Sequence, residues 1–141
     1  MAKTDRSGDV QHAALPYRRT LTGALEILLL TSRGTGRWII PKGWPMKGRK
    51  GWQTAALEAL QEAGVSGRIS KKPIGFFAAS KTLPDGDDRL MTIKVYPLLV
   101  KSELETWDER DERQRVWFAR DKAINLVSEG GLALLIEDFG V

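Results

Sequence analysis

The pattern of apolar and polar residues over the first forty positions predicts three strands, of which the second and third form a hairpin. Residues 11–19 (QHAALPYRR) predict a first strand, and residues 24–31 (ALEILLLT) predict a second one that is buried, because its apolar run is nearly continuous. SRGTGR then turns the chain, and residues 38–40 predict the other half of a hairpin. Pro16 predicts an edge position or a bulge for the first strand, because proline donates no ladder hydrogen bond.

The second half of the chain continues in the same way. Residues 68–82 and 90–101 predict two long strands, and the turn between them carries a strong signal at Asp85-Gly86. The remaining predicted elements are a short strand at 116–118, a helix at 120–127 and an apolar closing helix at 132–139. Strands on both sides of a central helix, with helices at the end, indicate an α+β sandwich.

That central helix is predicted at residues 54–63, with Gly64 as its stop. At about 100° per residue, its alanines and leucines cover most of the circumference and leave one polar stripe. Glu58 and Glu62 are four residues apart, so their carboxylates lie one turn from each other on one face. Taken alone, this stripe is read most simply as the solvated face of a core helix.

The loop before the helix changes that interpretation. Gly43, Pro45 and Gly48 exclude regular structure. The cations of the loop are Lys42, Lys47, Arg49 and Lys50. Such a loop turns N–H groups and ammonium groups toward an anion. A hard cation such as Mg²⁺ takes a few carboxylate oxygens together with water and phosphate, so loop and helix together indicate a site for a metal and a phosphorylated ligand.

Residues 43–65 resemble the Nudix box of pyrophosphate hydrolases: Gly, five residues, Glu, seven residues, then Arg-Glu-hydrophobic-x-Glu-Glu-x-Gly-hydrophobic. The matching positions are Gly43, Glu58, Ala59, Glu62, Gly64 and Val65. The preceding WIIPKG is similar to the entry strand of the diphosphoinositol polyphosphate and dinucleoside polyphosphate branch. The resemblance implies a Nudix-type α/β/α sandwich with a mixed β-sheet, formed by a single domain at residues 11–141 after a disordered tail at residues 1–10.

Three positions depart from the pattern. Arg49 stands in place of the first Glu, Leu57 in place of the Arg, and Gln61 in place of the first Glu of the pair. In the family the residues at the first two positions are understood to interact, so losing both leaves no single buried charge unpaired. Gln61 brings an amide oxygen without a negative charge. Metal affinity should therefore fall, and the substrate's phosphates should supply much of it.

The resemblance implies a metal-dependent hydrolase, using Mg²⁺ or Mn²⁺, that cleaves a diphosphate linkage in a nucleoside diphosphate derivative or a diphosphoinositol polyphosphate. Glu58 would be the general base or a metal ligand. The implied metal ligands are the Gly43 carbonyl, Glu58, Gln61 and Glu62, with one more acidic residue from the run 103–115, where Glu109 and Glu112 are equal candidates by spacing. The candidates for binding substrate phosphate are Arg18, Arg33, Arg37 and Lys42. Without the resemblance, the arginines and the acidic run are ordinary solvated charges.

A second hypothesis is a catalytically lapsed Nudix domain, which binds a nucleotide or phosphorylated metabolite without hydrolysing it. The three altered positions favour it, and the retained Glu58 and Glu62 oppose it.

Composition and charge limit the alternatives. A chain of 141 residues fits one domain, and the absence of cysteine excludes disulfides and thiol catalysis. Neither a transmembrane run nor a signal peptide is visible, so we expect a soluble, cytoplasmic protein. Residues 1–50 carry a net charge of +7 and residues 51–141 one of −3. The basic half indicates a polyanionic partner, and without a nucleic-acid-binding signature a small phosphorylated ligand is expected.

Overall fold

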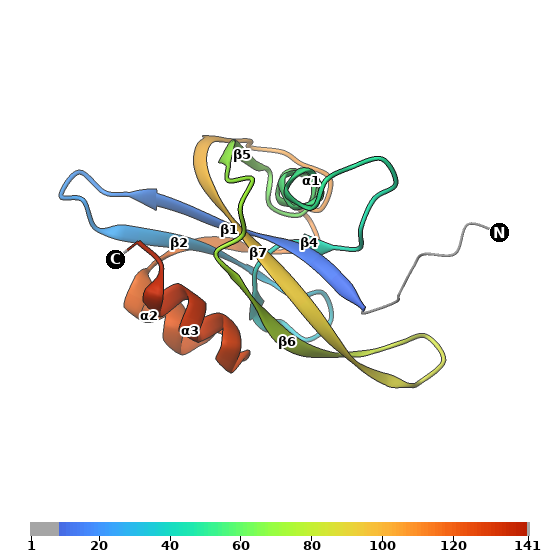
Figure 1. Cartoon of the computed structure of the whole chain (residues 1–141). Helices are drawn as coiled ribbons and strands as arrows, with labels where there is room; N and C mark the ends of the chain where they lie inside the picture. The colour runs from blue at the N-terminus through green and yellow to red at the C-terminus, as the bar shows by residue number, and fades with distance from the viewer. Residues whose placement is uncertain (1–8, 141) are drawn as a thin grey trace.

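Within residues 9–140, which are those that the computed structural model describes, eight strands form one mixed sheet with helices on both faces (Figure 1). The predicted disordered tail lies almost wholly outside these residues. The strands are β1 (Val10–Arg19), β2 (Leu25–Thr31), β3 (Trp38–Ile39), β4 (Lys42–Gly43), β5 (Val65–Ile69), β6 (Gly75–Thr82), β7 (Asp88–Glu103) and β8 (Arg115–Ala119). The helices are α1 (Gly51–Ala63), α2 (Arg120–Leu126) and α3 (Gly130–Asp138). None of these helices is long and apolar enough to cross a membrane.

The centre of the sheet is the parallel pair β1 and β7, in register from Val10 beside Thr92 to Tyr17 beside Leu99. The other edge of β1 is also paired, with β4 at one end and β2 at the other. The edge position predicted from Pro16 is therefore wrong. Pro16 lies between the segments that pair with β4 and with β2, so its missing N–H leaves no gap in a ladder.

Helix α1 begins at Gly51, in place of the predicted Thr54, because Gln53 caps its start: the Lys50 N–H donates to Gln53 Oε1 at 2.6 Å. The predicted stop is confirmed, since Gly64 adopts the left-handed conformation with φ 66°. Side chains from beyond the helix satisfy its last carbonyls. Trp107 Nε1 donates to Glu62 O at 2.9 Å, and Arg115 Nη1 donates to Ala63 O at 2.8 Å.

The single strand predicted at residues 68–82 is in fact two. β5 pairs with the C-terminal part of β7, and β6 pairs with the N-terminal part of the same edge. The interruption carries its own turn, in which Ser70 Oγ donates to Lys72 O, and Pro73 follows, which has no N–H for a ladder. The turn predicted at Asp85-Gly86 is confirmed, with Gly86 at φ 89°.

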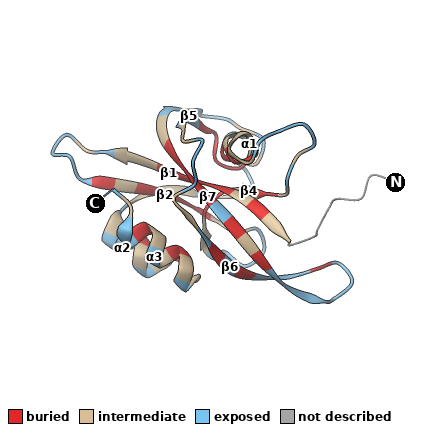
Figure 2. Ribbon diagram, in the orientation of Figure 1, coloured by how far each residue is buried: buried red, intermediate tan, exposed pale blue. Residues whose placement is uncertain are grey.

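Two apolar clusters hold the layers together, one on each face of the sheet. Ala55, Ala59 and Ala63 of α1 are fully buried on one face, where their small side chains let the helix lie close to the strands. Helices α2 and α3 cover the other face. Buried positions follow the middle of the strands and the inner sides of the helices (Figure 2). The α/β/α sandwich expected from the resemblance is confirmed.

Candidate active site

A pocket of about 490 Å³ lies where β4, the following loop and α1 meet the loop before β8. Glu58, Glu62, Lys42 and Gly43 all line it. Its other lining residues are Gln11, Arg33, Trp44, Pro45, Met46, Lys81, Glu109 and Arg113. The two helix carboxylates therefore share one cavity with the lysine-bearing segment before the helix, and the acidic stripe is not simply a solvated face.

Glu58 and Glu62 are held at short range to each other and to the backbone of β4. A Cβ added at Gly43 would overlap the Glu58 carboxylate, so the helix can bring this carboxylate against β4 only because residue 43 is glycine. Glu62 is 6% exposed. Burial, with hydrogen bonding to Glu58, raises the pKa of Glu62 to about 8. Burial also raises the pKa of Glu58. This is the behaviour of two acids that share a partly desolvated site.

Arg113 forms an ion pair with Glu62. Its side chain is 9% exposed, and its Nη2 lies 3.8 Å from Glu62 Oε1. Its Nε donates to Glu109 Oε1 at 2.7 Å, and its Nη1 donates to the carbonyl oxygen of Thr31 at 3.2 Å. The guanidinium therefore joins the loop before β8 to α1 and to the end of β2.

Lys42 lies on the cationic side of the pocket and makes no ion pair with any residue between 9 and 140. Burial lowers the pKa of its ammonium group. A second pocket, of about 650 Å³, adjoins the first and shares Gln11, Arg33, Lys42, Lys81 and Arg113 with it. Arg37 lines the second pocket only. A desolvated ammonium group that makes no ion pair, next to several other cations, is the kind of environment that favours an anion.

Comparison with known proteins agrees with this arrangement, although no protein-family model matches the chain. Nudix hydrolase 12, mitochondrial, of Arabidopsis thaliana is 32% identical over 118 residues, which cover 82% of this chain and 58% of the relative. Diphosphoinositol polyphosphate phosphohydrolase 2 of Rattus norvegicus is 30% identical over 125 residues, which cover 87% and 65%. The chain is similar in sequence to Nudix hydrolases. It spans less than two thirds of the length of these two Nudix relatives.

Solved structures support the Nudix fold. The binary complex of a C. elegans Ap4A hydrolase superposes with a TM-score of 0.67 at 22% identity, covering 93% of this chain and 94% of that one. The NUDIX domain of Shewanella oneidensis NrtR, complexed with ADP ribose, also gives 0.67, at 14% identity, covering 96% and 88%.

Several residues predicted for the Nudix site lie outside the pocket. Gln61 is exposed and does not line it. Glu112 is at the surface, where Arg33 Nη1 lies 3.0 Å from its Oε1. Arg18, on β1, pairs with Glu26 at 2.7 Å and stacks on the Trp117 ring at 4.1 Å.

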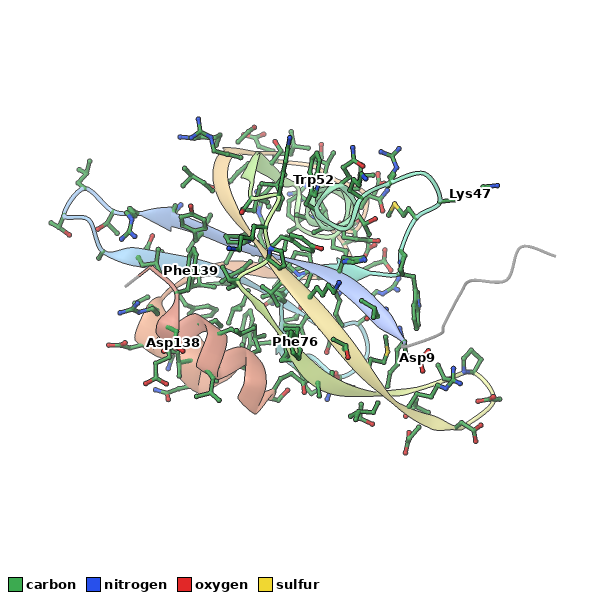
Figure 3. All side chains as sticks on the ribbon, in the orientation of Figure 1. Asp9, Lys47, Trp52, Phe76, Asp138 and Phe139 are labelled. Atoms are coloured by element: carbon green, nitrogen blue, oxygen red, sulfur yellow. The ribbon has the colours of Figure 1, made fainter. Side chains whose placement is uncertain are left out.

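The cations of the loop before α1 are likewise split between the pocket and the surface. Lys42 lines the pocket, whereas Lys47, Arg49 and Lys50 are exposed. Lys47 points outward from the loop before α1 (Figure 3). The cations that line the pocket therefore come from four different segments and not from the loop alone.

Sequence reasoning missed Gln11, Lys81 and Arg113. Arg113 stands in a mixed-charge run, and nothing local distinguishes it from its neighbours. Lys81 had a usable signal, because it continues the alternation of Phe77 and Ala79, the buried face of β6. A charged residue at the end of a series of inward-facing strand residues indicates a polar cavity at that end of the strand.

The donor set suits a hard divalent cation. The side chains that α1 contributes to the pocket, Glu58 and Glu62, carry carboxylate oxygens, which are ligands that such a cation prefers, and Gly43 lines the same pocket. Among the described residues, no group of three or more His, Cys, Asp or Glu side chains is placed to hold an ion. The protein itself thus offers two carboxylates, and water and phosphate oxygens would complete the coordination.

Proposed function

We propose that the protein is a metal-dependent hydrolase that cleaves a diphosphate linkage in a nucleoside diphosphate derivative or a diphosphoinositol polyphosphate. One observation carries the proposal: Glu58 and Glu62 line the same cavity as Lys42 and Gly43, so carboxylates and a phosphate-binding cation meet in one place. The names of the relatives, which include a diphosphoinositol polyphosphate phosphohydrolase and an Ap4A hydrolase, support this substrate class.

The roles follow from the positions of the residues. Glu58 accepts a proton from the attacking water, since its raised pKa brings it toward the working range of a general base. Lys42, Arg33 and Arg37 line the cavities that would hold the phosphates of the substrate. Glu62, Glu58 and the Gly43 carbonyl would hold Mg²⁺ or Mn²⁺, which lowers the pKa of bound water and neutralises charge on phosphate oxygens. Gln61 and Glu112 are not part of this set.

A substrate panel with one variant and one control tests the proposal. Purified protein with Mg²⁺ or Mn²⁺ is incubated with ADP-ribose, diadenosine polyphosphates, nucleoside triphosphates and diphosphoinositol phosphates. We expect turnover of at least one compound, and a loss of about a hundredfold or more in Glu58→Gln, the scale of a general base. Glu105 is exposed and has no side-chain contact with a described residue, so Glu105→Gln should keep full activity. Full activity of Glu58→Gln would refute the assignment.

The second candidate is a lapsed domain that binds such a compound without cleaving it. It is favoured by the exposure of Gln61 and, among residues 9–140, by the lack of a group of three acidic or histidine side chains placed to hold an ion. The same panel separates the two functions. Tight binding without product, measured by calorimetry and phosphate release on the same samples, would support the lapsed domain.

The cytoplasmic location expected from the sequence stays a prediction. Several relatives bear mitochondrial or chloroplastic names, so imaging of the tagged protein in its own cells is the appropriate measurement.

A further inference from the structure

Glu109 and Glu112, the two candidates for an additional metal ligand in the sequence, each pair with an arginine. Glu109 accepts a hydrogen bond from Arg113 Nε at 2.7 Å, and Glu112 lies 3.0 Å from Arg33 Nη1. Both arginines line the pocket that contains Glu58. The pairs differ in burial, because the side chains of Arg33 and Glu112 are 59% and 48% exposed, while those of Arg113 and Glu109 are 9% and 22% exposed. Only the buried pair has a fixed geometry.

The hydrogen bonds of Arg113 leave one of its three guanidinium nitrogens, Nη2, without a hydrogen-bond acceptor among the described residues. Nε is bonded to Glu109, and Nη1 is bonded to the Thr31 carbonyl. Nη2 is 3.8 Å from Glu62, which is too long for a hydrogen bond, so its N–H groups have no acceptor among the described residues. Arg113 lines both this pocket and the adjoining one that holds Arg37, so its side chain is shared by the pocket with the carboxylates and the pocket with further cations.

The backbone around Arg113 is anchored as well. Gln114 N donates to Thr31 Oγ1 at 2.9 Å, and Thr31 N donates to Gln114 O at 3.1 Å. Glu109 is tied to the helix, since its N–H donates to Gln61 O at 3.3 Å. The guanidinium and its acidic partner therefore occupy a rigid setting before any ligand arrives, which lowers the entropy lost on binding.

We propose that Glu109 is a positioning residue and not a metal ligand: it fixes Arg113 so that Nη2 binds a phosphoryl oxygen of the substrate. This inference rests on the proposed function, because it assigns two further residues to the same site. The lack of a three-carboxylate group among the described residues agrees with it, and so does the bond that already engages Glu109 Oε1.

Charge alone predicts the opposite effect of removing Glu109, which makes the proposal testable. Loss of an anion beside the cationic pocket would strengthen phosphate binding by Coulomb attraction. Loss of a positioning partner would weaken it, because Arg113 is then free to rotate away from the cavity. A metal ligand, by contrast, would leave its mark on cation affinity.

The experiment measures two affinities by calorimetry, neither of which requires turnover: tripolyphosphate at low salt in EDTA, and Mn²⁺ without phosphate. Glu109→Met keeps side-chain volume and removes the acceptor. We expect it to bind tripolyphosphate about tenfold more weakly, the scale of one charge-assisted hydrogen bond, and to bind Mn²⁺ like the wild type. Glu109→Gln keeps an acceptor for Nε and should restore tripolyphosphate binding to within about twofold. Arg113→Lys keeps the positive charge but loses the planar guanidinium with its several N–H donors, and should weaken tripolyphosphate binding as Glu109→Met does.

Asp111→Asn is the matched control, because Asp111 is exposed in the same loop and its side chain makes no hydrogen bond or ion pair with a described residue. It should change tripolyphosphate affinity by no more than about twofold. A tenfold loss of Mn²⁺ affinity in Glu109→Met, stronger tripolyphosphate binding in that variant, or no tripolyphosphate binding by the wild type would each overturn the inference. Because binding is measured without hydrolysis, a lapsed enzyme would still support it.

Discussion

Gly43 and Glu58 are in such close contact that no side chain fits between them: a Cβ on residue 43 would occupy the volume of the Glu58 carboxylate. The glycine that opens the Nudix box therefore has a steric role here that its backbone conformation does not require, since its φ is not positive. It lets the Glu58 side chain of α1 lie against β4, so that Gly43 and the Glu58 carboxylate line the same pocket.

Gly43→Ala should displace the Glu58 carboxylate and reduce activity by about tenfold or more, the usual cost of a misplaced catalytic group. The free energy of unfolding should change by only about 1 kcal/mol, because the Glu58 side chain can rotate into the pocket. Steady-state kinetics and urea denaturation on the same preparation check both. Wild-type kcat in this variant would contradict the assigned position of Glu58.

The raised pKa of Glu62, about 8, predicts how stability depends on pH in metal-free protein. The unfolded carboxyl has a pKa of about 4.5, so between these values the folded state binds more protons and stability falls as pH rises. We expect the wild type to lose roughly 3.5 kcal/mol of unfolding free energy between pH 5 and pH 8. Glu62→Gln should match it at pH 5 and exceed it at pH 8. Equal slopes in EDTA would contradict the assignment.

Gly64 combines a left-handed backbone with a close neighbour, and Gly48 separates the two effects. Both have positive φ, 66° and 76°, but a Cβ on Gly64 would lie 2.7 Å from the Trp107 ring, whereas Gly48 has open space. Gly48→Ala should cost about 1 kcal/mol from backbone strain alone. Gly64→Ala should cost about 2–4 kcal/mol, since the indole must also move. If urea denaturation shows the same loss of unfolding free energy in both variants, the Trp107 ring moves aside without an energetic cost.

Thr54 predicts a stabilising change. It is fully buried, and its Oγ1 has no hydrogen-bond partner. Thr54→Val keeps the shape and removes the unsatisfied hydroxyl, so the unfolding free energy should rise by about 0.5–2 kcal/mol. Catalytic parameters should not change, because Thr54 does not line the pocket. A lower melting temperature in calorimetry would imply a partner for this hydroxyl, such as a buried water.

Local chemistry allowed the central parts of this fold to be predicted. The alanine-rich run with Gly64 after it determines α1 and its end, and Asp85-Gly86 determines the turn before β7, because both depend on neighbouring residues only. The break between β5 and β6 was missed, since Pro73 and the turn at Ser70 lie inside an otherwise strand-like run. Pro16 misled because the partner of a strand residue is set by tertiary structure.

The site was predictable in its helix and not in its surroundings. Glu58 and Glu62 are related by helical spacing, and the segment with Lys42 precedes them directly, so sequence placed these three together. Lys81 and Arg113 line the pocket although they are far from the helix in the sequence, and the sequence does not show which distant residues come close together in space. The choice between Glu109 and Glu112 likewise depended on which arginine each one meets.

The indole of Trp107 and the guanidinium of Arg115 cap the end of the helix that bears Glu62, and they stack on each other with 4.0 Å between the guanidinium carbon and the ring centroid. The loop before β8 and the helix of the Nudix box are thus a single unit for engineering. An exchange of this loop with that of a relative, made to change which phosphate compound is accepted, would have to keep Trp107. Without it, the Glu62 carbonyl at the end of the helix would lose its hydrogen-bond donor.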